Sequence, residues 1–333
     1  MSQPILHYAR MEWPTSWDDL YGHKAPLLLE IGFGSGHFLV DWAQRRPDCN
    51  VLGMEISLPS LRRGAKKTQV ASLSNLRILQ ADSRAALWLL FSPGFISEVI
   101  INFPDPWPKA NHHHRRLINE NFLCLLGTRV HAGASLDIAT DHVEYAAVIA
   151  NCLELSPYFD NRLQVPYLTE DKARLQTKYE KIALAEGRSC HYFKYRRNSQ
   201  VASDSFLIPE VSAVPHVVLS CPLHLDEIGR QFEPRLVEAG NMNIKYLDAF
   251  RSTIDGLLLA EVYVSEEPFH QRVCLAIRSR QGQDIVVSLH PIGFPRPTPG
   301  LHLAIHHLVQ WLQTLHSGVA VITSTLKVPD DTY

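Results

Sequence analysis

Short apolar runs alternate with amphipathic stretches from Pro26 to Asn198. The apolar runs that predict strands are 26–32, 50–56, 76–82, 98–103, 135–140, 162–167 and 191–195. The helical patterns between them are 36–46, 59–72, 83–91, 114–128, 142–154 and 170–187. Apolar strands that alternate with helices are typical of a parallel sheet covered on both faces. We therefore expect a Rossmann-like α/β domain whose last strand pairs antiparallel at the sheet edge.

A different pattern follows the segment 198–215, which lacks helical periodicity and is rich in Ser, Ala and Pro. Strands come in succession there, with a helix near each end, which predicts a smaller α+β domain. Its expected strands are 216–220, 243–252, 256–265, 270–280, 284–290 and 318–327, and its expected helices are 224–238 and 299–316. We expect the second helix to pack Leu308, Trp311, Leu312 and Leu315 on its own sheet. The chain thus divides into a first domain (1–200), a linker (201–213) and a second domain (214–333).

Composition narrows the class of protein. The chain is 46% hydrophobic and 20% charged, as soluble globular proteins are, and its apolar runs are too short to cross a bilayer. No signal segment opens it. The six cysteines lie far apart without a C-x-x-C pair, which argues against disulfides and zinc, so we expect a cytoplasmic protein.

Charge is distributed unevenly. Residues 1–200 carry 23 Lys and Arg against 20 Asp and Glu, a net charge of +3, whereas residues 201–333 carry 9 against 14, a net charge of −5. A polyanion would therefore bind the first domain rather than the second. Two basic clusters in the first domain either bind a nucleic-acid backbone or simply form solvent-exposed surface. They are Arg62, Arg63, Lys66 and Lys67, and Lys194, Arg196 and Arg197.

The first strand runs into a glycine turn, "LEIGFGSGHFL" (29–39), which precedes a helix. Gly32, Gly34 and Gly36 follow a G-x-G-x-G spacing, unlike the G-x-G-x-x-G of dinucleotide folds. Glu30 lies two residues before the first glycine, where it would repel a pyrophosphate. A carboxylate at this place suits a cationic ligand such as S-adenosylmethionine.

Two further acids end the next two predicted strands. Glu55 is placed to accept from both ribose hydroxyls of a nucleoside, and Asp82 from an adenine amino group. Each acid alone is explained equally well as a helix cap or a strand end. Three acids at successive strand ends, together with the glycine turn, favour an adenosylmethionine pocket.

The fourth strand leaves the predicted core through "NFPDPWPK" (102–109). Its three prolines predict a stiff loop at the edge of the sheet where ligands bind. Asp105 is then held toward a substrate. Trp107 either stacks on a nucleobase or packs against the first helix, and Lys109 contacts a phosphate or a base.

These residues resemble a known family. "EIGFGSGHFL", "GMEI", "FPDPWPK", "RRL", "TDH" and "TKYEK" are similar, in order and spacing, to bacterial tRNA (guanine-N7-)-methyltransferases over about residues 24–197. The resemblance implies a class I methyltransferase fold and transfer of a methyl group from S-adenosylmethionine to N7 of guanosine 46 in the tRNA variable loop. It implies that Glu30, Glu55, Asp82 and Asp105 line the donor site together with the glycine turn, and that Asp105 is catalytic. The substrate contacts that it implies are Lys109, Asn111, His112, His113, His114, Arg115, Arg116, Asp141, Thr177, Lys178, Tyr179 and Glu180.

The segment "ANHHHRRL" (110–117) departs from the family pattern. A Lys is usual at the position of His114, and Asn111 often has a basic counterpart. Consecutive histidines point in divergent directions and no matching cluster lies elsewhere, so we expect no metal site. We expect Arg115 and Arg116 to begin a helix and to bind phosphate. Two fewer positive charges should weaken RNA binding at this segment.

The sequence leaves other functions open. A small-molecule or other-RNA methyltransferase would share the donor site, and a non-catalytic RNA-binding relative would share the fold. A nicotinamide-dependent oxidoreductase is disfavoured by Glu30 and by the glycine spacing. The second domain lies outside the resemblance, so we expect a scaffolding role: docking on the first domain, forming a homodimer, or binding a protein partner.

Overall fold

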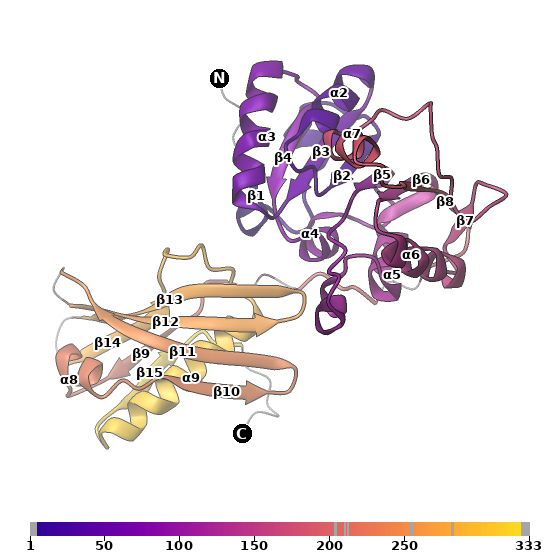
Figure 1. Ribbon diagram of the computed structural model, residues 1–333. Coiled ribbons are helices and arrows are strands. Elements are labelled where there is room, and N and C mark those ends of the chain that lie inside the picture. The colour runs from indigo at the N-terminus through magenta and orange to yellow at the C-terminus, as the bar shows by residue number, and fades with distance from the viewer. Residues whose placement is uncertain are drawn as a thin grey trace. The chain divides into compact units, whose positions relative to one another are not determined.

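The computed structural model divides the chain into two compact units, Met1–Ile208 and Pro209–Tyr333 (Figure 1). The residues that it describes are 5–202, 205–209, 211, 213–253, 256–280 and 283–327.

The first unit contains an eight-stranded sheet in the order β1-β4-β3-β2-β5-β6-β8-β7. All neighbours from β1 to β6 are parallel, and β8 is antiparallel to both β6 and β7. The strands are β1 (Leu6–His7), β2 (Leu27–Ile31), β3 (Asn50–Glu55), β4 (Leu76–Gln80), β5 (Ile96–Asn102), β6 (Val130–Thr140), β7 (Phe159–Asn161) and β8 (His191–Arg197). Every residue of β2 and β3 is buried, which explains why these strands are apolar on both faces. The expected parallel sheet with an antiparallel edge is confirmed.

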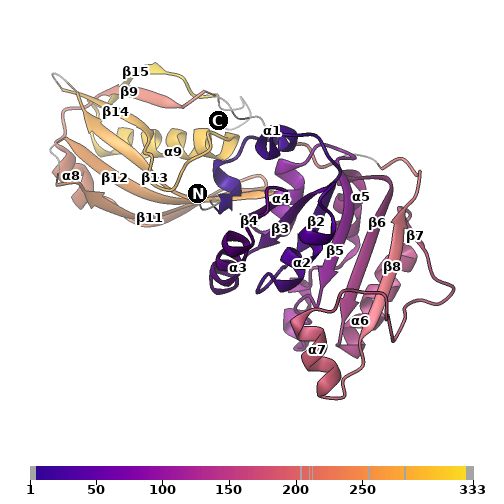
Figure 2. The ribbon, with the colours of Figure 1, turned by 90° about the horizontal axis from the view of Figure 1, so that it is seen from above.

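Helices cover both faces of this sheet (Figure 2). Helices α2 and α3 pack together on one face, and α4, α5 and α6 pack in sequence on the other. The helices are α1 (Trp17–Tyr21), α2 (His37–Arg45), α3 (Leu58–Ala71), α4 (Ser83–Leu90), α5 (Glu120–Arg129), α6 (Val143–Leu155) and α7 (Lys178–Ala185), with 3₁₀ helices η1 (Tyr8–Arg10) and η2 (Ala110–Arg115). This arrangement leaves the carboxyl ends of the parallel strands available for a ligand.

Three elements expected in the first unit differ from the structure. The helix expected over 114–128 begins only at Glu120, because the Asn119 side chain caps it by accepting from the Phe122 amide at 3.0 Å. The helix expected over 170–187 likewise begins at Lys178, where Thr177 forms a capping box. The strand expected over 162–167 does not form. Its Pro166 lacks a backbone donor, and β8 pairs instead with 159–161.

The second unit is a seven-stranded antiparallel sheet in the order β10-β11-β12-β13-β14-β9-β15, with helix α9 packed on it. Its elements are β9 (His216–Ser220), α8 (Leu225–Arg230), β10 (Arg235–Ala239), β11 (Met242–Arg251), β12 (Leu257–Glu266), β13 (Phe269–Ser279), β14 (Asp284–Leu289), α9 (Pro299–Leu315) and β15 (Ala320–Ser324). Leu308 and Leu312 are fully buried, and Trp311 and Leu315 pack beside them, as expected. The helix expected over 224–238 ends at Arg230, because the next segment pairs with β11 as β10.

The start of the segment between the two sheets is bound to the first unit. The Trp88 indole N–H donates to the Leu207 carbonyl at 2.7 Å, and the Trp88 ring meets Phe206 edge-on. The buried Arg129 donates to the Phe206 carbonyl at 2.9 Å. Residues 206–207 therefore belong structurally to the first unit. Separately, none of the helices formed by the described residues is both long enough and apolar enough to span a membrane.

Candidate active site

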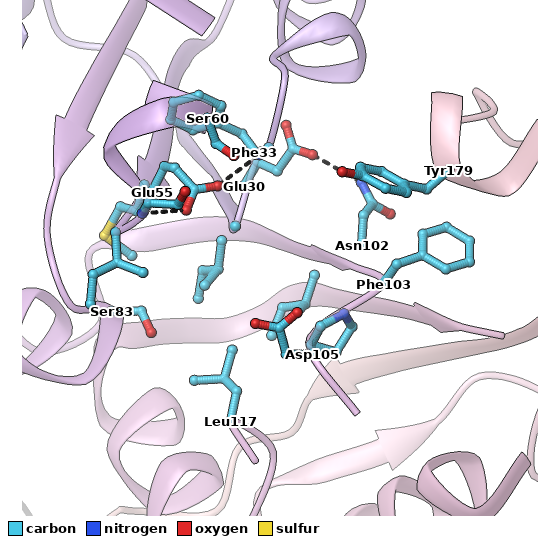
Figure 3. Close-up of a pocket in the computed structure, with 18 of the residues that line it drawn as sticks. Glu30, Phe33, Glu55, Ser60, Ser83, Asn102, Phe103, Asp105, Leu117 and Tyr179 are labelled. Carbon is cyan, nitrogen blue, oxygen red and sulfur yellow. Dashed lines mark hydrogen bonds between the residues drawn. The ribbon is translucent and has the colours of Figure 1, made fainter. Parts of the chain in front are cut away.

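A cavity of about 450 Å³ opens at the carboxyl ends of β2, β3, β4 and β5 (Figure 3). Its lining includes Glu30, Glu55, Asp82, Asp105 and the first two glycines of the turn. Residues that the sequence placed at four separate strand ends thus meet around one space. Figure 3 shows Glu30, Glu55, Asn102 and Asp105 around the same cavity.

The glycine turn has a backbone that only glycine adopts without strain. Gly32, Gly34 and Gly36 have φ values of 74°, 57° and 75°. A Cβ at Gly36 would also lie 3.1 Å from the Gly64 Cα, so the turn packs directly on helix α3. Gly36 lies at the start of α2 and does not line the cavity, whereas Gly32 and Gly34 do.

The buried side chain of Phe33 holds the glycine turn in place. A Cβ on Gly53 would lie 2.6 Å from the Phe33 ring, and one on Gly64 would lie 2.4 Å from it. Both glycines therefore make room for this buried ring between β3 and α3. Sequence reasoning missed Phe33, which occupies a variable position between two glycines of the motif, and Gly53 and Gly64, which lie outside it.

Glu30 is the buried acid of the site, with 1% of its surface exposed. Its Oε1 accepts from the Asn102 side-chain amide at 3.0 Å. Its Oε2 is buried and receives no hydrogen bond from the residues that the structure describes. Burial raises the pKa of this carboxyl to about 8, although the Asn102 hydrogen bond and the nearby Arg174 act in the opposite direction. The site thus contains a buried carboxyl group with one oxygen unbonded by the described residues, and a nearby positive charge would favour its ionised form.

Arg174 connects Asn102, at the floor of the cavity, to Glu180 on helix α7. No sequence motif predicted a role for this arginine. Its guanidinium donates to the Asn102 side-chain oxygen and, through Nε, to Glu180 Oε2 at 3.2 Å. It also lies over the ring of Tyr192, whose hydroxyl donates to Glu180 Oε1 at 2.9 Å. Asn102 is therefore held with its amide nitrogen toward Glu30, because Arg174 occupies its oxygen.

Glu55 and Asp82 both line the cavity and both also bind backbone amides. Glu55 accepts from the Gly34 amide at 2.9 Å and from the Ser57 amide at 2.8 Å, which orients its carboxylate against the turn. Asp82 Oδ1 accepts from the amides of Arg84 and Ala85, both at 3.0 Å, and so caps helix α4. The capping explanation is correct for Asp82, and contact with a nucleoside stays a prediction for both acids.

Asp105 is exposed and lies on a loop with an unusual backbone. Phe103 and Trp107, on either side of it, have φ values of 50° and 44°, which are strained for residues with a side chain. The loop is held by the Phe103 amide, which donates to Ala139 at 2.8 Å, and by Arg116 Nε, which donates to the Pro106 carbonyl at 2.8 Å. Prolines and remote contacts together fix the backbone of the loop that carries this carboxylate.

The 110–116 segment differs from expectation. Arg115 and Arg116 do not begin a helix: Arg115 is the last residue of η2, Arg116 follows it, and α5 starts at Glu120. Arg116 is 5% exposed and stacks on the Tyr145 ring, so it braces the loop instead of facing solvent. Arg115 lines the cavity and lies 5.0 Å from the Trp107 ring centroid.

Trp107 also lines the cavity, and its recorded ring contacts are Arg115 and His112. The remaining members of the expected RNA segment lie outside the cavity, and most of them are exposed. They are Lys109, Asn111, His112, His113 and His114.

The residues of the "TKYE" motif have two different roles: some stabilise helix α7 and some line the cavity. Thr177 and Glu180 form the capping box of α7, with the Glu180 amide donating to Thr177 Oγ1 at 3.0 Å. Glu180 is fully buried and does not line the cavity, whereas Thr177, Lys178 and Tyr179 do. Asp141 is likewise outside the cavity and forms an ion pair with Arg188. Any substrate contact of Glu180 or Asp141 would require a rearrangement of these pairs.

A parallel sheet with a glycine turn after β2, and acids at the ends of the next strands, defines a Rossmann-like class I methyltransferase. Residues 24–192 match a family model described as "Putative methyltransferase". The tRNA (guanine-N(7)-)-methyltransferase of Thermus thermophilus is 32% identical over 90% of this chain and 93% of its own. That of Thermotoga maritima is 28% identical over the same shares, and that of Paraburkholderia xenovorans is 37% identical over 54% of this chain and 69% of its own. The chain belongs to the tRNA (guanine-N(7)-)-methyltransferase family.

These relatives also revise one expectation from the sequence. The resemblance was expected to stop at the linker, but two alignments cover 90% of the chain and therefore include most of the second unit. The second unit therefore has a counterpart in the sequences of these two relatives, whereas others align with about half of this chain.

Proposed function

We propose that this protein transfers the methyl group of S-adenosylmethionine to N7 of a guanosine in tRNA. Guanosine 46 of the variable loop is the target that the sequence resemblance implies. Family membership supports the reaction class, and the geometry of the cavity supports the roles of individual residues.

The residues around the cavity fit adenosylmethionine. Glu30 Oε2 is a buried acceptor without a hydrogen bond from the described residues, which suits a cationic group. Gly32 and Gly34 present backbone without side chains, and Glu55 is fixed beside them. Glu30, Glu55 and the turn would hold the donor. When bound, adenosylmethionine supplies an electrophilic methyl group on a positively charged sulfur.

The acceptor needs little acid–base chemistry. Guanine N7 carries a lone pair and no proton, so its methylation requires no general base. The protein must align the ring with the methyl group and stabilise the positive charge that develops on the guanine. A carboxylate near the ring can do this and can also accept from guanine N1–H and the amino group.

Asp105 is the residue best placed for that task, and its position is the observation that carries the proposal. It lies on the same cavity as Glu30 and Glu55, on a loop braced by Pro106 and Arg116. Tyr179, which is 59% exposed and lines the same cavity, offers an aromatic face for a base.

The test is incubation of the full-length protein with methyl-labelled adenosylmethionine and unmodified tRNA, followed by digestion and nucleoside analysis. We expect label only in 7-methylguanosine, and its loss with a transcript that carries adenosine at position 46. Label in another nucleoside would overturn the proposed chemistry, and label in 7-methylguanosine at another position would overturn only the proposed target. Turnover of a small molecule but not of tRNA would assign the site to a small-molecule methyltransferase.

A further inference from the structure

Helices α3 and α7 reach the glycine turn from two different parts of the chain. Lys67 on α3 donates to the Ser35 carbonyl at 2.8 Å. The Tyr179 ring on α7 lies 3.8 Å from the position of a Cβ built on Gly34. The two helices therefore meet at this turn, on the rim of the cavity that Lys178 and His37 also line.

Each of the two helices carries a pair of basic side chains one turn apart, and we refer to these four as the rim cations. They are Arg63 and Lys67 on α3, of which Lys67 contacts the turn, and Lys178 and Lys181 on α7, of which Lys178 lines the cavity. Within the described part of the chain none of the four forms an ion pair; Arg63 donates to the Ser60 hydroxyl at 3.0 Å. The other basic cluster of the first unit behaves differently. Lys194 pairs with Asp171 at 2.7 Å, and Arg197 is buried and donates to Gly127.

The rim cations act on one another across the turn. The pKa of Lys67 is lowered by burial and also by Lys178 and Arg63. The pKa of His37 is lowered by burial, then by Lys67 and Lys178, with a smaller effect of Lys181; Asp41 acts in the opposite direction. Like charges held this close, without an ion pair to any described acidic residue, form a favourable site for an anion.

We infer that the rim cations bind phosphate groups of the tRNA strand beside the target guanosine. This inference rests on the proposed function and adds a substrate-binding surface to it. Phosphates held at the rim would place a neighbouring base near the mouth of the cavity. Within segment 110–116, Arg116 is buried and so is not available to phosphates, whereas Arg115 is exposed and lies over the Trp107 ring.

Helix α3 offers a matched control. Arg62 and Lys66 are exposed neighbours of Arg63 and Lys67 on the same helix, so their replacement removes the same charge elsewhere on the surface. The rim variants are Arg63→Gln with Lys67→Gln, and Lys178→Gln with Lys181→Gln. The control is Arg62→Gln with Lys66→Gln.

The experiment measures tRNA affinity of the full-length protein by fluorescence anisotropy at several KCl concentrations, and adenosylmethionine affinity by calorimetry. Each rim variant should reduce the slope of log K against log salt by about 1.4 to 1.8, since each phosphate contact contributes about 0.7 to 0.9. The control should change the slope by less than about 0.5 and should leave methylation intact. The charge-conserving variant Arg63→Lys with Lys67→Arg should keep the slope of the natural protein.

Three outcomes would overturn the inference. Equal losses in rim variants and control would indicate only general attraction to RNA. An unchanged slope in the rim variants would show that phosphates bind elsewhere. A fall in adenosylmethionine affinity as large as the fall in tRNA affinity would assign the cations to the carboxylate of the donor. Failure of the natural protein to methylate tRNA would contradict the proposed function instead. The labelling assay described above measures that methylation independently of the binding experiments.

Discussion

The floor of the cavity and its rim are held in different ways. The floor consists of Glu30 and Asn102, which are buried and joined by a hydrogen bond, and Asn102 is held in turn by the Arg174 side chain, which is 8% exposed. The rim carries Asp105 and Tyr179, which are exposed and positioned mainly by the backbone beneath them. Changes to the floor should therefore affect folding and donor binding, and changes to the rim should affect turnover and RNA.

The largest effect is expected for Arg174→Met. Removing a buried guanidinium leaves the Glu180 carboxylate without its ion-pair partner, which typically costs about 3–5 kcal/mol. The matched control is Arg188→Met, whose guanidinium is half exposed, and which should cost less than about 1 kcal/mol. Urea unfolding measures both values. Equal losses would show that burial does not distinguish these two arginines.

Asp105→Asn keeps the shape of the rim residue and removes its charge. If this carboxylate stabilises the positive charge that develops on guanine, turnover should fall by roughly 100-fold or more while donor affinity changes less. Single-turnover kinetics and calorimetry separate the two effects. An equal loss in both would place Asp105 chiefly in donor binding.

Glu30→Gln is the corresponding change in the floor. Loss of a charge-assisted contact should weaken adenosylmethionine binding by about 1–3 kcal/mol, roughly 5-fold to 150-fold in affinity. Affinity for tRNA alone should stay the same, since Glu30 is buried at the end of β2. Calorimetry measures the affinity for adenosylmethionine, and fluorescence anisotropy measures the affinity for tRNA. Unchanged donor affinity would show that Glu30 does not bind the donor and only stabilises the glycine turn.

The raised pKa of Glu30, about 8, predicts a pH dependence. A cationic donor prefers the ionised carboxylate, so its affinity should rise by up to about tenfold per pH unit as pH rises toward 8. Stability of the free protein should change in the opposite sense. The folded pKa lies above the ordinary value of 4.5, so this contribution is present below pH 4.5 and is lost as pH rises through about 8. Calorimetry and thermal unfolding at several pH values test both trends, which should vanish in Glu30→Gln.

Deletion of the second unit should have the smallest effect on chemistry. The Paraburkholderia relative aligns with only 54% of this chain, and every residue that lines the cavity belongs to the first unit. A chain that ends at Ile208 should bind adenosylmethionine normally and methylate tRNA, with an affinity within a few-fold of the full protein. A chain that ends at Asn198 should be less stable by about 1–3 kcal/mol, because Arg129 loses the Phe206 carbonyl. Loss of methylation in a folded, donor-binding chain that ends at Ile208 would give the second unit a part in the RNA site.

Local signals in the sequence predicted the order of elements and most of the cavity. The glycine turn, the acids at the strand ends and the proline loop can each be recognised in a short stretch of sequence. The parallel sheet then brings the strand ends to one edge, so the meeting of Glu30, Glu55, Asp82 and Asp105 followed from topology.

Tertiary structure alone decided which of these side chains have other partners. Asn102 and Arg174 are 72 residues apart, and their contact depends on the path of an irregular loop. Arg116 turned inward because Tyr145 and the Pro106 carbonyl lie beneath it, and helix caps at Asn119 and Thr177 overrode longer periodic patterns. Periodicity shows which face of an element is buried. Only the packed chain shows which charged groups are satisfied within the protein and which remain available to a ligand.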